Sequence, residues 1–162
     1  MIKIKNNFLP KKLLKEINFL VTDYSFPWYY HPFVVDDNIK GKEMYFTHIL
    51  FREDTVNSSF YEKIMSNFLK KLNIKKLKRA KLNLYPFTNK LIKHGWHTDS
   101  EISNKVALFY LNENNGFTFF KNPNKKIESN SNKCVLFDSD TVHRSTNCTD
   151  TLCRITLNIN YD

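Results

Sequence analysis

The chain has few of the residues and segments that mark disulfide-rich, zinc-binding or membrane-spanning proteins. Only three of its 162 residues are cysteines, and no two of them have the Cys-x-x-Cys spacing of a zinc site. No apolar run approaches the roughly 20 residues that a membrane-spanning helix needs. The amino terminus MIKIKNNFLP also lacks the apolar core of a signal peptide. We therefore expect reduced thiols, no membrane partner and a cytoplasmic location.

Glycine and acidic residues are also scarce. The three glycines, Gly41, Gly95 and Gly116, are expected in turns. Lysine and arginine number 25 against 16 acidic residues, which gives a formal net charge of +9. One basic cluster has two interpretations: the solvated end of a helix, which we favour, or a surface that follows a nucleic-acid backbone. The cluster consists of Lys70, Lys71, Lys75, Lys76, Lys78, Arg79 and Lys81.

The first half of the chain predicts helices. A length of 162 residues is typical of one domain, and we expect residues 1–162 to form one. Residues 10–21 and 59–72 repeat apolar side chains at helical spacing, and Ser58 or Ser59 is available to cap the second helix. Residues 23–39 carry two prolines among aromatics and indicate a structured loop or short edge pieces, whereas 44–52 is a candidate strand.

The second half predicts strands. They are expected at residues 79–85, 105–111, 117–120, 133–137 and 152–161, with a loop rich in Asn and Ser at 128–132. Helices followed by closely spaced strands indicate an α+β protein whose carboxyl-terminal half is a β-sandwich or barrel.

The most informative stretch is His97-Thr98-Asp99, followed at a distance by His143. In an extended segment side chains at i and i+2 point the same way, so His97 and Asp99 can reach one metal ion. Two imidazoles and one carboxylate are the set that holds a non-haem Fe(II) and leaves positions open for co-substrate and oxygen. The alternative is a surface turn, and His94, His31 and His48 are weaker candidate ligands.

The last predicted strand alternates strictly between apolar and polar residues. Arg154, Thr156, Asn158 and Asn160 therefore share one face. Alternation alone favours a strand with one packed face and one face in water. The other interpretation is that Arg154 binds a carboxylate through its fork of donors, with help from the hydroxyl of Thr156. Arg144 is the rival cation, but on a strand it would point away from the His143 side.

These residues resemble a known family. The segments HGWHTDSE, VALFYLNENNGFTFF, VLFDSDTVHRSTNCTD and LCRITLNINY look like the Fe(II)- and 2-oxoglutarate-dependent oxygenases of the prolyl-4-hydroxylase-like group, closest to short phage and bacterial members. The resemblance implies a double-stranded β-helix, which is a cupin-like jelly-roll barrel, formed by about residues 79–161. Helices within about residues 1–78 would support this barrel. For a phage member the location would be the host cytoplasm.

The resemblance also implies roles for individual residues. His97, Asp99 and His143 would bind Fe(II), Arg154 would pair with 2-oxoglutarate, and Thr156, Tyr85 and Asn83 would lie beside that co-substrate. Tyr85 has the alternative of simple packing, and Lys93 and Trp96 flank the metal motif as candidates for the substrate mouth.

The implied reaction is hydroxylation of a C–H bond by O2, with 2-oxoglutarate converted to succinate and CO2 and with ascorbate as a possible reductant. A prolyl residue in a peptide or protein is the first choice of substrate. A nucleic-acid base hydroxylase or dealkylase is the second hypothesis, because of the basic charge. A barrel that binds a metal or small ligand without turnover is the third. The sequence leaves the oligomeric state open.

Overall fold

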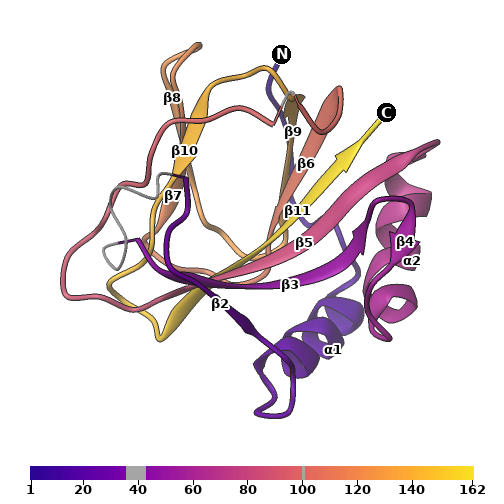
Figure 1. Cartoon of the computed structure of the whole chain (residues 1–162). Helices are drawn as coiled ribbons and strands as arrows, with labels where there is room; N and C mark the ends of the chain where they lie inside the picture. Colours follow the sequence, from indigo (N-terminus) through magenta and orange to yellow (C-terminus); the bar gives the residue numbers. More distant parts are fainter. Residues whose placement is uncertain (36–42, 100) are drawn as a thin grey trace.

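The computed structural model describes residues 1–35, 43–99 and 101–162, so the turn expected at Gly41 and the end of the 23–39 segment lie outside it. These residues form two antiparallel sheets and two helices (Figure 1). The larger sheet has the order β1-β9-β6-β11-β5-β3-β2, with β4 paired to β3, and the smaller has the order β10-β7-β8. The helices are α1 (Lys11–Thr22) and α2 (Tyr61–Leu72), and the strands are β1 (Lys3–Lys5), β2 (Tyr29–His31), β3 (Tyr45–Arg52), β4 (Thr55–Val56), β5 (Leu77–Pro86), β6 (Lys105–Tyr110), β7 (Phe117–Phe120), β8 (Lys125–Glu128), β9 (Lys133–Asp138), β10 (His143–Ser145) and β11 (Cys153–Tyr161).

Both helices pack on one face of the larger sheet and confirm the predicted helices to within two residues (Figure 1). Phe68 of α2 meets Phe109 of β6 edge-on, with ring centroids 5.0 Å apart. The predicted serine cap of α2 is wrong, because no side chain of a described residue caps this helix. The hydroxyl of Ser58 instead accepts a hydrogen bond from the Phe60 N–H and bonds the His48 ring.

The alternation along β11 has a different consequence from the one that periodicity alone favours. Its apolar side chains enter the core beneath the helices. Its polar side chains are buried as well: Arg154 and Asn160 are 0% exposed and Thr156 is 1% exposed. The interpretation of a water-facing polar side is therefore wrong. The polar side faces the interior between the two sheets.

The segment before β6 continues the smaller sheet through isolated backbone contacts. His97 and His143 form an antiparallel bridge in which each N–H donates to the other's carbonyl oxygen at 2.9 Å. The Asp99 N–H donates to the Ser139 carbonyl oxygen at 2.9 Å. These bonds hold the His-Thr-Asp segment beside β10. They fix the backbone positions from which His97 and Asp99 project.

The strands predicted in the second half are confirmed, with ends that differ by at most two residues. Strands β1, β4, β8 and β10 were not predicted, because each has only two to four residues and is too short to give a clear pattern. Strand β2 is one of the edge pieces expected within 23–39. In the described part of the chain no helix has the length and apolar character to cross a membrane.

Candidate active site

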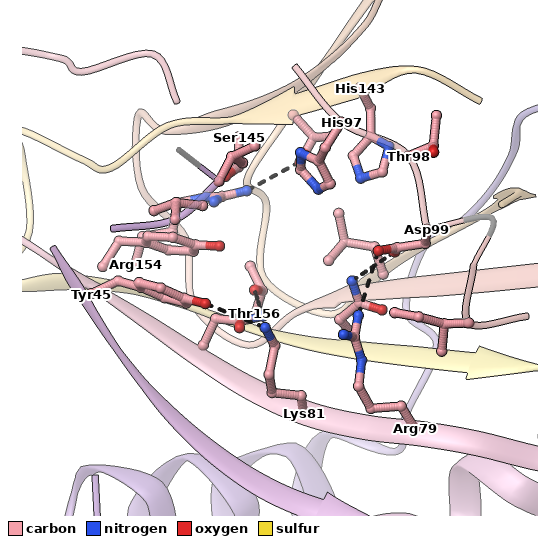
Figure 2. Close-up of a pocket in the computed structure, with 18 residues that line it drawn as sticks. Tyr45, Arg79, Lys81, His97, Thr98, Asp99, His143, Ser145, Arg154 and Thr156 are labelled. Atoms are coloured by element: carbon pink, nitrogen blue, oxygen red, sulfur yellow. Dashed lines mark hydrogen bonds and ion pairs between the residues drawn. The ribbon is translucent and has the colours of Figure 1, made fainter. Parts of the chain in front are cut away.

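One cavity of about 300 Å³ lies between the larger sheet and the wall made by β10 and the segment of His97 and Asp99 (Figure 2). Its size is at the lower end of the range for small-molecule sites. Every residue assigned to the metal or the co-substrate from the sequence lines it. These are His97, Asp99, His143, Arg154, Thr156, Tyr85 and Asn83.

The two imidazoles stand together on the wall formed by the smaller sheet, with ring centroids 4.3 Å apart. Burial, reinforced by the neighbouring His143, lowers the pKa of His97 to about 4. Burial also lowers the pKa of His143. Nδ1 of His143 donates to the Thr141 carbonyl oxygen at 2.9 Å, and Nδ1 of His97 donates to the Gly95 carbonyl oxygen at 3.4 Å. The rings are therefore neutral near pH 7 with Nε2 unprotonated, as a metal ligand requires.

The carboxylate of Asp99 completes the predicted donor set but has other partners here. It is 5% exposed and accepts from Arg79 Nη2 at 3.4 Å and Asn158 Nδ2 at 3.2 Å. Burial alone would raise its pKa, but Arg79, His143 and the Asn158 hydrogen bond together hold the pKa below its usual value. Within the described residues no three His, Cys, Asp or Glu side chains stand at metal-binding distance. The residue types fit a divalent metal once this carboxylate turns toward the imidazoles.

Arg154 is the most unusual group in the cavity, because its side chain is 0% exposed and carries a full charge. Its guanidinium donates to the Thr146 carbonyl oxygen at 3.0 Å and to the hydroxyls of Thr118 and Ser129 at 3.2 Å. Every one of these acceptors is neutral, and no described carboxylate pairs with it. A buried cation needs an anion to offset its loss of hydration. The site therefore has the chemistry to bind an anionic ligand.

Three neighbours of Arg154 form a polar surface next to it. Tyr85 lies opposite Arg154 in the β5–β11 register, and its ring centroid is 5.4 Å from the guanidinium carbon. Asn83 lies opposite Thr156 and donates from Nδ2 to the threonine hydroxyl at 3.3 Å, which leaves that hydroxyl proton free to be donated onward. Oδ1 of Asn83 is buried and has no hydrogen-bond partner among the described residues. Burial raises the pKa of Tyr85, so its phenol stays protonated and can donate.

The rival histidines do not line this cavity. His48 bonds the Pro27 carbonyl oxygen and the Ser58 hydroxyl, both at 2.7 Å, and is a core residue with both nitrogens satisfied. His94 bonds the Ser145 hydroxyl at 2.7 Å, and burial lowers its pKa to about 3. His31 packs on the Tyr45 ring with centroids 5.3 Å apart.

Arg144 points to the outer side of the smaller sheet, as strand alternation predicts. Its guanidinium carbon lies 4.2 Å from the Trp96 ring centroid and 5.8 Å from that of Phe119. Trp96 is 36% exposed and is therefore not part of the core. Neither Trp96 nor Lys93 lines the cavity, so the prediction that they form its mouth is not supported.

The sequence interpretation of the basic cluster is wrong for two of its members. Arg79 and Lys81 lie on β5 with their side chains in the cavity, not in solvent. Lys78 pairs with Asp162 at 3.3 Å, and Lys71 donates to the Phe8 carbonyl oxygen. The missed signal was the period of two: Arg79 and Lys81 alternate in step with Asn83, which was already assigned to the site.

No protein-family model matches the sequence, and no curated protein matches it. Solved structures do. A prolyl hydroxylase of Trichoplax adhaerens, in complex with a peptide fragment of the hypoxia inducible factor oxygen degradation domain, matches with a TM-score of 0.73. The alignment has 16% identity and covers 99% of this chain and 82% of that one. The chain has the fold of the 2-oxoglutarate- and iron-dependent oxygenases.

Two further structures with this oxygenase fold come from a bacterium and a virus. A Pseudomonas putida prolyl-4-hydroxylase matches with a TM-score of 0.65 at 16% identity, over 99% of this chain and 92% of that one. A viral collagen prolyl hydroxylase from Paramecium Bursaria Chlorella virus-1, solved with 2-oxoglutarate, has a TM-score of 0.63 at 13% identity, over 98% and 93% of the two chains. At these identities the likeness establishes the fold, and the activity has to be argued from the cavity.

Proposed function

We propose that this protein is an Fe(II)- and 2-oxoglutarate-dependent dioxygenase that hydroxylates a C–H bond, with a prolyl residue of a peptide as its substrate. The observation that carries the proposal is the buried cation of Arg154, whose hydrogen-bond partners are all neutral. It lines the same cavity as two neutral imidazoles and Asp99. A buried cation beside a metal-type donor set suits a ligand that is both an anion and a chelator. 2-Oxoglutarate is such a ligand.

His97, His143 and Asp99 would hold the iron. The backbone carbonyls that accept from each Nδ1 orient the two rings and keep each Nε2 lone pair available. The carboxylate of Asp99 would give up hydrogen bonds to Arg79 and Asn158 in order to bind the metal. When bound, the iron supplies the activation of O2 that oxidises 2-oxoglutarate to succinate and CO2 and hydroxylates the substrate.

Arg154 would bind the carboxylate of 2-oxoglutarate that is remote from the metal. Two of its donors can face one carboxylate in parallel, an arrangement that lysine cannot reproduce. The hydroxyl of Thr156 and the phenol of Tyr85 would donate to the same ligand. The unpartnered Oδ1 of Asn83 would accept from a water or from the substrate.

We also propose that the two sheets form a closed jelly-roll barrel. The core of the larger sheet has four neighbouring strands, β9-β6-β11-β5. The smaller sheet adds the His97 segment to β10-β7-β8 through the bridge between His97 and His143. Two four-stranded antiparallel layers with the cavity between them correspond to the eight-stranded jelly-roll.

A peptide substrate is supported by the Trichoplax structure, which holds a peptide fragment. The basic cluster offers less support for nucleic acid than its sequence suggests, because Arg79 and Lys81 face the cavity. A prolyl residue is therefore the first substrate to test.

The test combines succinate release with mass spectrometry. The protein is incubated with Fe(II), 2-oxoglutarate, ascorbate and a library of proline-containing peptides. We expect succinate together with a gain of one oxygen on a peptide proline. Asp99→Ala should abolish both, since one of three protein ligands to the metal is removed.

Asp138→Ala is the matched control, because Asp138 lies at the surface and pairs with the amino terminus and Lys105. We expect it to keep both products. Succinate without peptide oxidation would exclude the prolyl substrate. No succinate with any peptide would exclude the oxygenase activity itself.

A further inference from the structure

Two more cations, Arg79 and Lys81, line the cavity on the side formed by β5 (Figure 2). Arg79 and Lys81 are two residues apart on β5 and project to the same side of the strand. Tyr85, which lies opposite Arg154, is four residues beyond Lys81, or about 13 Å along the strand at the usual rise. The Tyr45 and Tyr85 rings, with centroids 5.5 Å apart, separate the Lys81 ammonium from the Arg154 guanidinium.

The charges that line the cavity do not balance. Arg79, Lys81 and Arg154 are cations, whereas Asp99 is the only acidic residue among the described lining residues. In the proposed function, one carboxylate of 2-oxoglutarate pairs with Arg154 and the other goes to the metal. Once Asp99 also gives one of its oxygens to the metal, Arg79 keeps at most the other. Bound co-substrate therefore leaves Arg79 and Lys81 to share a single oxygen of Asp99, with no anion of their own.

A purely structural role accounts for Arg79 but not for Lys81. Arg79 orients the Asp99 carboxylate at 3.4 Å and donates from Nε to Asn160 Oδ1 at 3.1 Å. Lys81 Nζ has a neutral phenol, the Tyr45 hydroxyl at 3.4 Å, and lies 5.5 Å from the centroid of the same ring. Burial, with the nearby charge of Arg79, lowers the pKa of Lys81 to about 8, so it is mostly charged at pH 7. Its only direct partner within the described part of the chain is neutral, so no carboxylate there contacts the ammonium, although the charge of Asp99 nearby acts in its favour.

We propose that Arg79 and Lys81 bind a carboxylate of the substrate, next to the carbon that is hydroxylated. This inference rests on the proposed function and narrows its substrate class to acidic peptides. The carboxylate belongs either to an Asp or Glu side chain flanking the proline or to the end of a peptide chain. The same two cations select against a basic residue at that position.

The test measures equilibrium binding of labelled peptides to the protein loaded with Mn(II) and 2-oxoglutarate under anaerobic conditions, so it needs no turnover. The internal peptides place Glu, Gln or Lys next to the proline, and a second pair ends in proline with a free or an amidated carboxyl group. We expect the Glu peptide or the free-acid peptide to bind at least tenfold more tightly than its neutral counterpart. Which pair shows the difference identifies the source of the carboxylate.

Lys81→Met keeps the length of the side chain and removes its charge. We expect it to abolish the preference for the acidic peptide, and Lys81→Glu should favour the Lys peptide instead. Lys78→Met is the matched control, because Lys78 lies on the same strand but pairs with Asp162 outside the cavity. A thermal melt of each variant excludes unfolding as the cause. Lys81→Gln provides a second neutral variant if Lys81→Met does not fold.

Steady-state kinetics provide a second readout. Lys81→Met should raise the KM for the acidic peptide about tenfold and the KM for 2-oxoglutarate much less. Equal binding of acidic and neutral peptides would overturn the inference. So would a Lys81→Met effect confined to 2-oxoglutarate, or tight, salt-sensitive binding of an oligonucleotide in place of any peptide. Charge-selective binding without succinate release would refute the proposed function alone, whereas succinate release without charge selectivity would refute this inference alone.

Discussion

The buried, neutral state of His94 should make the stability of this protein depend on pH. Burial, with the charges of Arg154 and His97 nearby, lowers the pKa of His94 from 6.5 to about 3. Between these two values the unfolded chain binds a proton at His94 and the folded chain does not. Stability is therefore complete above pH 6.5 and decreases as the pH falls, by about 1.4 kcal/mol for each pH unit.

The size of this effect at pH 4.5 follows directly. Two pH units below 6.5 correspond to roughly 2.7 kcal/mol from His94, a large part of the 5–15 kcal/mol that stabilises a typical domain. His97, whose pKa is about 4, contributes in the same direction and over the same range. Burial also lowers the pKa values of His143, His48 and His31, so replacing His94 should remove only its own share of the histidine-dependent loss.

Urea unfolding at pH 7 and pH 4.5, with a chelator present, measures this difference. His94→Gln keeps a polar group that can reach the Ser145 hydroxyl but has no group that titrates in this range. We expect the free energy of unfolding of this variant to fall by roughly 2–3 kcal/mol less than that of the wild type between the two pH values. An equal fall in both proteins would refute the neutral, buried His94. In a separate experiment, thermal melts with added Mn(II) compare the two proteins. If Mn(II) raises the melting temperature of the wild type but not that of His94→Gln, His94 is a metal ligand.

Three further substitutions test the site and its support. Gly116→Ala would place a Cβ 2.6 Å from Arg154 Cδ and 2.5 Å from the Asn147 carbonyl oxygen. We expect this crowding to lower the stability in thermal melts by about 1–3 kcal/mol and to weaken 2-oxoglutarate binding. Wild-type stability and wild-type binding in this variant would contradict the packing. Arg154→Lys keeps the charge but loses the fork of donors. We expect the 2-oxoglutarate concentration that gives half-maximal succinate release to rise about tenfold or more. An unchanged concentration would show that Arg154 does not bind the co-substrate. Phe68→Ala deletes a ring that is 1% exposed and packs on Phe109. We expect the free energy of unfolding in urea to fall by about 3–5 kcal/mol. A fall below about 1 kcal/mol would show that α2 does not support the sheet.

The sequence predicted which of these side chains lie close together because their spacing has a local geometric meaning. His97 and Asp99 share a side of an extended segment, and Arg154 and Thr156 share a side of β11. The cavity contains all four. What the sequence left open was whether the polar side of β11 meets water or protein, since alternation is the same in both cases. The second sheet decides this, and its pairing is set by contacts between residues far apart in the chain.

Other features depended on contacts that no local pattern contains. Lys81 belongs to a run of lysines in the sequence, but its place on β5 directs it into the cavity. Strand β8 has the sequence Lys-Lys-Ile-Glu and is a strand only because it pairs with β7. The partners of the Asp99 carboxylate come from β5 and β11, so they could not be predicted from the His-Thr-Asp segment.

The most direct test of the central claim is a calorimetric titration of 2-oxoglutarate into the protein under anaerobic conditions, with and without Mn(II) in place of Fe(II). We expect one 2-oxoglutarate per chain, bound tightly only when the metal is present. Asp99→Ala should lose the dependence on metal, and Arg154→Lys should weaken binding even with metal. Two results would contradict a cavity in which His97, Asp99, His143 and Arg154 act together. One is no binding of 2-oxoglutarate by the wild type, and the other is binding by both variants that is as tight as that of the wild type.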